Sequence, residues 1–359
     1  MIYFVSIFSL VFLLSFTDFS KKFSNLGTNI SIVLLSMLAG FRNVGGKDFE
    51  AYRFLYDTGL SIGDTEIGYN FLNTLFHNIG ISYNIFLFII SLFSIFVLVK
   101  ALQKISVYPQ LSLLLYIGTY FFFYDMVLNR QMIAISLLLW VMFFWEKNKI
   151  YSISLLILAF LFHKSIIIVF PFLLIFEFAK NKKYRWMFLF VLGIILALVI
   201  TPKDLLDIII TNSFTVNNRL SGYILQQENS LIAYNVEIFE YIKLIIMIFI
   251  VIPVWKQLYA NKKTLIWLFF YFVGAIFLLW SSKYEIMSRL YIYFDLSFIV
   301  LFAYCLEAYI HRFSLSDKQF KFCIYFIVGI LAIISVCYRA YNFGDFLSEY
   351  QFYFMETLV

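Results

Sequence analysis

Charged residues are scarce in this chain of 359 residues, and that scarcity excludes a soluble globular protein. Only 13% of the residues are charged and 63% are hydrophobic, with a mean hydropathy of +0.90. Soluble domains carry roughly a quarter charged residues and about half apolar ones. The sequence also lacks the polar–apolar alternation that a membrane β-barrel requires. Because backbone groups in lipid must be satisfied within their own segment, we expect an all-α integral membrane protein.

Motifs for metal and nucleotide binding are missing as well. The three histidines are dispersed, and neither HExxH nor CxxC occurs. Neither a Walker A sequence nor GxGxxG is present, which argues against a nucleotide-driven motor. The three cysteines show no metal spacing, so we expect small core residues at Cys305, Cys323 and Cys337. We expect no metal site in the protein and no cofactor.

The basic residues gather in short clusters between the apolar runs, so the net charge of +6 does not indicate nucleic acid as a partner. Such clusters are typical of cytoplasmic loops in membrane proteins. The first sixteen residues lack a basic start and a small-residue cleavage site, so we expect a retained first span with its N-terminus outside. The sequence indicates no separate soluble domain, and we expect a single transmembrane domain over residues 1–359.

Alternating the basic clusters across a bilayer predicts about 12 spans, within a range of roughly 10 to 13. Segments 42–83 and 202–235 are then polar segments on the outer face. The single spans are expected at about 1–17, 28–41, 84–99, 108–124, 128–145, 186–201, 236–254, 265–280, 290–310 and 322–338.

The remaining apolar run, 150–179, has basic clusters at both ends and must cross and return within thirty residues. Each arm is then shorter than the roughly 20 residues of a full span. We expect two short helices that meet at His163, Lys164 and Ser165. Irregular backbone at membrane depth is tolerated where it is buried in protein or lines a wet cavity. The pair His163–Lys164 is therefore expected to face a polar cavity near the outer side, and the alternative is a polar hairpin tip without chemistry.

Four cations, Arg42, Arg130, Lys164 and Arg289, fall at the outer ends of expected helices. Basic residues on that side oppose the orientation rule, so another function should explain them. Arginine grips phosphate oxygens with a planar fork, lysine acts as a point charge, and histidine serves as a general base near neutral pH. An outward cavity with these groups suits an anionic headgroup with a leaving phosphate. For Arg130, the alternative is snorkelling to lipid headgroups.

The outer segment from residue 42 starts with the turn NVGGKD and continues with apolar residues at helical spacing between Phe49 and Leu55. We expect a short interfacial helix there, and the alternative is a solvated loop. Asp295 falls inside an expected span, where a lone carboxylate is costly. It is expected either to pair with Arg289 or Tyr291 or to line a cavity.

Five stretches follow one another along most of the chain: FRNVGGKDFEAY (41–52), EIGYNFL (66–72), NRQMIAISLLLW (129–140), FLFHKS (160–165) and SRLYIYF (288–294). Their order and spacing resemble the successive motifs of the EpsG-type polysaccharide polymerases, a group placed with the Wzy O-antigen polymerases. The resemblance implies a GT-C-like glycosyltransferase of the hexosyltransferase type in the bacterial inner (cytoplasmic) membrane, with its active site facing the periplasm or cell exterior.

The implied reaction joins oligosaccharide repeat units that are carried on undecaprenyl diphosphate. The growing chain moves from its lipid diphosphate to a sugar hydroxyl of the next lipid-linked unit, and undecaprenyl diphosphate is released. Donor and acceptor are then both undecaprenyl-diphosphate-linked oligosaccharides in membrane lipid, and no nucleotide sugar or cofactor is implied. The resemblance leaves open whether a chain-length regulator also binds.

Placed on this sequence, the resemblance assigns a role to each polar candidate. Arg42, Arg130 and Arg289 are expected to hold the diphosphate and to stabilise its charge as it leaves. His163 is the candidate general base with Lys164 beside it for phosphate, and Asp48 or Glu66 is the alternative base or orients acceptor sugars. The other expected substrate-binding residues are Tyr52, Gln131, Ser165, Tyr291 and Tyr293, although a tyrosine can equally belong to an interfacial belt.

Three other functions compete with this interpretation. A flippase for the same lipid-linked unit would distribute charge along both faces of the membrane, whereas the unexplained cations here lie on one side. A membrane O-acyltransferase would use a histidine near the first spans, and the first fifty residues contain none. An O-antigen ligase usually carries its large outer segment late in the chain, whereas the most polar one here comes early.

Overall fold

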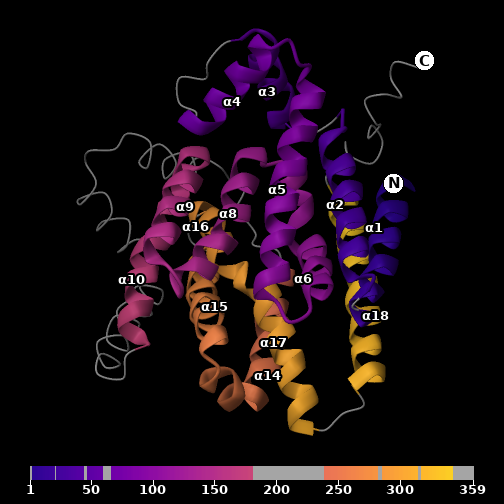
Figure 1. Ribbon diagram of the computed structural model, residues 1–359, viewed down its shortest axis with the longest axis vertical. Coiled ribbons are helices and arrows are strands. Elements are labelled where there is room, and N and C mark those ends of the chain that lie inside the picture. The colour runs from indigo at the N-terminus through magenta and orange to yellow at the C-terminus, as the bar shows by residue number, and fades with distance from the viewer. Residues whose placement is uncertain are drawn as a thin grey trace. The chain divides into compact units, whose positions relative to one another are not determined.

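The computed structural model describes residues 2–20, 22–43, 47–59, 66–180, 238–281, 285–313 and 317–342. Every regular element in these ranges is a helix, as the sequence predicts (Figure 1). Within them, five helices are long and apolar enough to cross a membrane: Tyr83–Ile105, Phe239–Ala260, Lys262–Ser281, Met287–Phe313 and Lys318–Arg339. Shorter apolar helices cover Tyr3–Phe19, Ser24–Gly40, Arg130–Trp145 and Lys149–Phe162.

The chain divides into two compact units. The first comprises Met1–Ile167 and Phe302–Val359, and the second comprises Ile168–Leu301. The helices of the first unit are α1 (Ile2–Ser15), η1 (Phe16–Phe19), α2 (Ser24–Gly40), α3 (Lys47–Asp57), α4 (Ile67–Asn78), α5 (Tyr83–Ile105), α6 (Pro109–Tyr116), η2 (Ile117–Phe121), α7 (Phe122–Met126), α8 (Asn129–Trp145), α9 (Lys149–Phe162), most of η3 (Lys164–Ile168), most of α17 (Ser297–Phe313) and α18 (Asp317–Asn342). The helices of the second unit are α10 (Val169–Ala179), α14 (Ile238–Ala260), α15 (Lys262–Ser281), α16 (Glu285–Asp295) and the start of α17.

The helices follow the expected spans closely. The run at 150–179 breaks where the sequence predicts, because α9 ends at Phe162 and α10 begins at Val169. A helix, α3, is present where the sequence predicts a short interfacial one, and the span expected at 290–310 is divided between α16 and α17. The span expected at 186–201, the segment 202–235 and residues 44–46 of the expected NVGGKD turn lie outside the described residues, and the last two residues of that stretch belong to α3.

In the first unit, α8 packs along α9 and against α5, and α5 also packs against α2. Helices α3 and α4 lie across one end of this group (Figure 1). The backbones of α4 and α9 approach closely at Gly68, where an added Cβ would lie 2.9 Å from the carbonyl oxygen of Leu161. Van der Waals packing is the main force between helices in lipid, and small residues at crossings strengthen it. Gly68 thereby brings the start of α4 against the end of α9.

A widened turn interrupts the helical segment 109–126. The π-type turn η2 frees backbone carbonyls, and side chains of α18 satisfy two of them. Ser335 donates to the carbonyl of Gly118 at 2.6 Å, and the Arg339 guanidinium donates to the carbonyl of Thr119. This arrangement ties α18 to the segment that leads into α8.

The second unit is held by aromatic packing. The ring of Phe294 stacks on that of Phe277 at 4.8 Å and meets that of Phe172 edge-on at 4.9 Å. Close approach again depends on a glycine, since a Cβ at Gly274 would lie 3.1 Å from the backbone nitrogen of Asp295. Helix α15 therefore packs tightly against the end of α16.

Candidate functional site

One carboxylate in the first unit joins three of the residues that the sequence singles out. Glu66 stands at the N-cap of α4, and its Oε2 lies 2.5 Å from Nη1 of Arg130. Its other oxygen, Oε1, lies 3.3 Å from Nδ1 of His163 and accepts a hydrogen bond from the backbone N–H of Lys164 at 3.4 Å. Residues from EIGYNFL, NRQMIAISLLLW and FLFHKS thus meet at one side chain.

Local backbone geometry positions each of these groups. His163 caps α9 in an extended conformation (φ −155°, ψ 109°), so the chain leaves the helix there and turns the imidazole toward α4. Arg130 is the second residue of α8, where the helix dipole disfavours a cation. The carboxylate of Glu66 offsets that cost. Gly68, the second residue of α4, permits the approach to α9 on which the contact depends.

The electrostatics of the cluster keep Glu66 ionised. Burial alone would raise the pKa of this carboxyl, whose side chain is only 8% exposed. The interactions with His163 and with the guanidinium of Arg130 outweigh burial and lower the pKa of Glu66 to about 2. The side chains of Arg130 and His163 are 25% and 23% exposed, so both remain within reach of a substrate.

Tyr52 from α3 lies against the same cluster. The guanidinium carbon of Arg130 is 5.2 Å from the centre of the Tyr52 ring, a cation–π contact. The Tyr52 ring also meets the Tyr69 ring edge-on at 5.9 Å. Three other candidates are neighbours of these residues in the sequence. Gln131, which follows Arg130, is buried. Lys164 is exposed, and Ser165 is half-buried in η3. The side chain of Asp48 lies outside the described part of the structure.

Arg42 is placed differently from Arg130, since only 1% of it is exposed. Its guanidinium donates to the carbonyl of Ala39 and lies 5.8 Å from the ring centre of Phe49 in α3. Its own carbonyl accepts a hydrogen bond from Asn84 at 3.2 Å. Arg42 is therefore an interior cation of the first unit, near the base of α3.

In the second unit, the structure brings together a buried ionic network that sequence reasoning missed. Nζ of Lys243 lies 2.5 Å from Oε2 of Glu240 and 2.5 Å from Oδ2 of Asp295. The Tyr291 hydroxyl donates to Glu240 at 3.1 Å. Arg289 or Tyr291 was the expected partner of Asp295, and the structure adds Lys243 from α14. A charged pair three residues apart inside the span expected at 236–254 was the signal that could have revealed this network.

The other candidates of SRLYIYF divide by exposure. Arg289 is exposed near the start of α16, whereas Tyr291 and Tyr293 are buried. Tyr291 belongs to the ionic network, and Tyr293 is a core residue of the second unit, with 0% of its surface exposed. Their burial favours a structural contribution of these two tyrosines over direct contact with a substrate.

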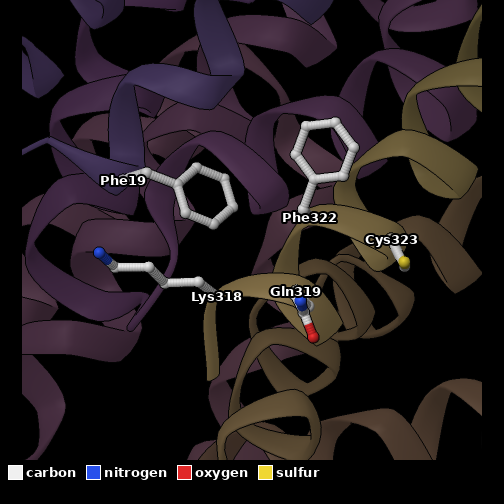
Figure 2. A pocket seen from close by; sticks show the side chains of 5 residues that line it. All are labelled: Phe19, Lys318, Gln319, Phe322 and Cys323. Carbon is white, nitrogen blue, oxygen red and sulfur yellow. The ribbon is translucent and has the colours of Figure 1, made fainter. Parts of the chain in front are cut away.

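A shallow hollow of about 570 Å³ lies elsewhere in the first unit, and no predicted site residue lines it. It is lined by Phe19 and by Lys318, Gln319, Phe322 and Cys323 from the start of α18 (Figure 2). Cys323 is exposed there, so the expectation of a core cysteine is wrong at this position, because it falls on an outer face of α18. The expectation is confirmed for Cys305, which is buried.

Comparison with known proteins gives one match. The sequence matches the family model described as the EpsG family over residues 25–352, a range that contains all five quoted stretches. No curated protein and no solved structure matches the sequence.

Proposed function

The chain belongs to the EpsG family of Wzy-type polysaccharide polymerases, and from this premise we propose the reaction that it catalyses. Its family and its apolar helices identify it as a multi-pass membrane protein of the polysaccharide polymerase type, which acts on lipid-linked saccharides. The proposed reaction transfers a growing oligosaccharide chain from undecaprenyl diphosphate to a sugar hydroxyl of the next undecaprenyl-diphosphate-linked repeat unit. The protein is then a hexosyltransferase-type glycosyltransferase with a lipid-diphosphate-linked donor.

The observation that carries this proposal is the single carboxylate shared by Arg130 and His163. Glycosyl transfer needs a group that accepts the proton of the acceptor hydroxyl and a group that stabilises the departing diphosphate. An imidazole and a guanidinium, both partly exposed and held by Glu66, supply these two functions side by side.

In the proposed mechanism, His163 is the general base. Its Nδ1 faces Glu66, which leaves Nε2 to accept the proton of the acceptor hydroxyl. The acceptor oxygen forms a bond to the anomeric carbon, and the bond from that carbon to the diphosphate oxygen breaks. Arg130 stabilises the negative charge that gathers on the leaving group. Undecaprenyl diphosphate departs, and the imidazolium then returns its proton to solvent.

Glu66 has a positioning role in this mechanism. A carboxyl with a pKa of about 2 is a weak proton acceptor at neutral pH, because an efficient base has a pKa near the working pH. As a carboxylate, it orients the imidazole of His163 and stabilises the imidazolium that forms. This assignment favours His163 over Glu66 as the base, whereas Asp48 keeps the alternative role proposed from its motif.

The remaining cations are proposed substrate ligands on separate grounds. Lys164 is exposed next to His163 and offers a point charge to the donor phosphate. For Arg289, the proposal rests on the motif SRLYIYF and on an exposed guanidinium. Gln131 and Ser165 adjoin Arg130 and Lys164 in sequence and are proposed to orient the substrate. For the interior Arg42, the proposal requires a displacement of α3.

We also propose the wider setting of the reaction. About 12 spans in a GT-C-like arrangement form one polymerase domain in the inner membrane, with the Glu66 cluster facing the periplasm or cell exterior. This orientation follows from the basic clusters of the sequence, which place α3, α4 and the break after α9 on the outer side. A flippase breaks no glycosidic bond and needs no group that deprotonates a sugar hydroxyl beside one that stabilises a leaving diphosphate, so the pairing of His163 and Arg130 through one carboxylate favours an enzyme.

A complementation assay tests the proposal. The gene is deleted in its host, wild type or His163→Ala is returned, and lipid-linked polysaccharide is separated on a gel, with membrane levels checked by immunoblot. We expect a ladder with wild type and single capped units with the variant at equal protein level. A ladder in both strains would remove the role of His163 and leave the polymerase assignment. A full ladder in the deletion strain would contradict the polymerase assignment for this pathway.

A further inference from the structure

Tyr69 carries a buried hydroxyl that the helical packing does not explain. The residue has 0% of its surface exposed, and its hydroxyl has no hydrogen-bond partner within the described ranges. Native proteins rarely leave such a group unsatisfied, and each exception calls for a reason such as a ligand. A phenylalanine would fill the same space between Tyr52 and Phe86, whose rings both meet that of Tyr69 edge-on.

The position of this hydroxyl connects it to the Glu66 cluster. Tyr69 lies in the first turn of α4, three residues after the N-cap residue Glu66. The positive charges of Arg130 and Arg42 both act on the hydroxyl. Burial, reinforced by Tyr83 and Tyr52, raises the pKa of Tyr69 well above its usual value, so the group stays a hydrogen-bond donor.

Tyr52 separates this donor from the outside. Its ring touches both the guanidinium of Arg130 and the ring of Tyr69, and the side chain is half-buried. Helix α3, which carries Tyr52, packs against α4 and α5, and the Tyr52 ring extends from it to Arg130 of α8. Displacement of one aromatic ring therefore uncovers a hydroxyl donor and a guanidinium together, a combination suited to a phosphate oxygen.

We propose that Tyr69 is a further substrate-binding residue, which donates a hydrogen bond to a phosphate oxygen of the lipid-diphosphate donor beside Arg130. This inference rests on the proposed polymerase function and adds a neutral donor to its cationic groups. In this arrangement Tyr52 occupies the phosphate position while the site is empty and moves away with α3 when the donor binds.

A second buried tyrosine provides the matched control. The hydroxyl of Tyr83 also lacks a hydrogen-bond partner in the described part of the chain and also lies within the influence of Arg42. It differs in its other neighbours, because the charges acting on it include the carboxylates of Asp57 and Glu50. Negative charge disfavours a phosphate near these carboxylates. Tyr83→Phe therefore removes a similar buried hydroxyl from a position where no phosphate is expected to bind.

The test measures binding of undecaprenyl diphosphate to purified protein in lipid nanodiscs, followed by the KM for the lipid-linked repeat unit. For Tyr69→Phe we expect roughly a 10- to 100-fold rise in the Kd for undecaprenyl diphosphate, the loss typical of a hydrogen bond to a charged group. The KM should rise in parallel, whereas Tyr83→Phe should change both constants by about two-fold or less. The melting temperature of Tyr69→Phe should equal or exceed that of wild type, because the substitution removes an unsatisfied polar group.

Each other result overturns a defined part of the inference. Equal affinity of Tyr69→Phe and wild type for undecaprenyl diphosphate would overturn it, whatever the gel assay shows. An effect on the repeat unit alone, without one on undecaprenyl diphosphate, would move the hydroxyl from phosphate to sugar recognition and so reject the phosphate role. Equal losses in Tyr69→Phe and Tyr83→Phe would indicate a general packing effect. Absence of both binding and ladder formation in wild type would reject the polymerase function itself.

Discussion

The two oxygens of Glu66 serve different partners: Oε2 lies 2.5 Å from Nη1 of Arg130, and Oε1 lies 3.3 Å from Nδ1 of His163. One side chain at the start of α4 therefore fixes the positions of residues from α8 and from the end of α9. The same carboxylate balances a guanidinium at a helix N-terminus and orients an imidazole. Changes at Glu66 should consequently affect binding and proton transfer together.

Glu66→Gln is the most direct test of the positioning role. The amide keeps the size of the side chain but removes the charge that Arg130 and the imidazolium of His163 require. We expect polymerisation to fall by roughly 10- to 100-fold, less than the 10²- to 10⁴-fold loss that removal of a general base such as His163 brings about. Initial rates with purified protein and lipid-linked repeat units measure the difference.

Glu50→Gln is the matched control for that change, because Glu50 is exposed on α3. Its rate should stay within about two-fold of wild type, as expected for a surface substitution away from the site. A Glu66→Gln rate as low as that of His163→Ala would contradict the assignment and point to Glu66 as the base.

The pKa of Glu66 also predicts a pH dependence of stability. Because folding lowers this pKa from 4.5 to about 2, the ionised group stabilises the fold above pH 4.5. That contribution is lost as the pH falls from 4.5 toward 2. The melting temperature of wild type in detergent should therefore drop more between pH 6 and pH 3 than that of Glu66→Gln. Parallel curves for the two proteins would show that the carboxylate does not stabilise the fold.

Much of the helical framework could be predicted because lipid imposes it. Long apolar runs must be helices, and the break between α9 and α10 falls at His163 and Lys164, where polar residues interrupt the run. The short helix α3 was predicted by its apolar spacing in the same way. These features depend on local sequence alone.

Pairings between distant segments could not be predicted in the same way. The sequence singled out Glu66, Arg130 and His163 separately, but their meeting depends on the close approach at Gly68, which no local pattern indicates. Lys243 escaped notice because its partner Asp295 is 52 residues away. The exposure of the arginines could not be predicted from the sequence either. Arg42 and Arg130 both fall at the outer ends of expected helices, yet Arg42 is buried and Arg130 is partly exposed.

Lys243→Met should reveal how much the buried network stabilises the second unit. The change leaves the carboxylates of Glu240 and Asp295 near each other without the ammonium between them. Removal of one partner from a buried ion pair typically costs about 3–5 kcal/mol. Unfolding in mixed detergent micelles measures the loss, and Lys243→Met combined with Asp295→Asn should recover part of it.

The control for the network is an exposed pair in the same unit, Lys180 with Glu177 at 2.8 Å. Lys180→Met should cost no more than about 1 kcal/mol, because solvent screens pairs of this kind. A similar cost for Lys180→Met and Lys243→Met would mean that the buried network contributes no more than a surface contact.

Gly68→Ala should move Glu66 away from His163 without changing either side chain. The added methyl group would lie 2.9 Å from the carbonyl oxygen of Leu161, closer than side-chain carbons normally approach backbone, so α4 must move away from α9. The distance of 3.3 Å between Glu66 and Nδ1 of His163 then increases, whereas the ion pair between Glu66 and Arg130 can be kept. We expect kcat to fall by roughly ten-fold or more with a smaller change in KM, since a displacement of about 1 Å can reduce catalysis strongly. Thr74→Ala, on the exposed face of α4, should leave kcat unchanged, and a normal kcat for Gly68→Ala would show that proton transfer does not depend on the approach of these two helices.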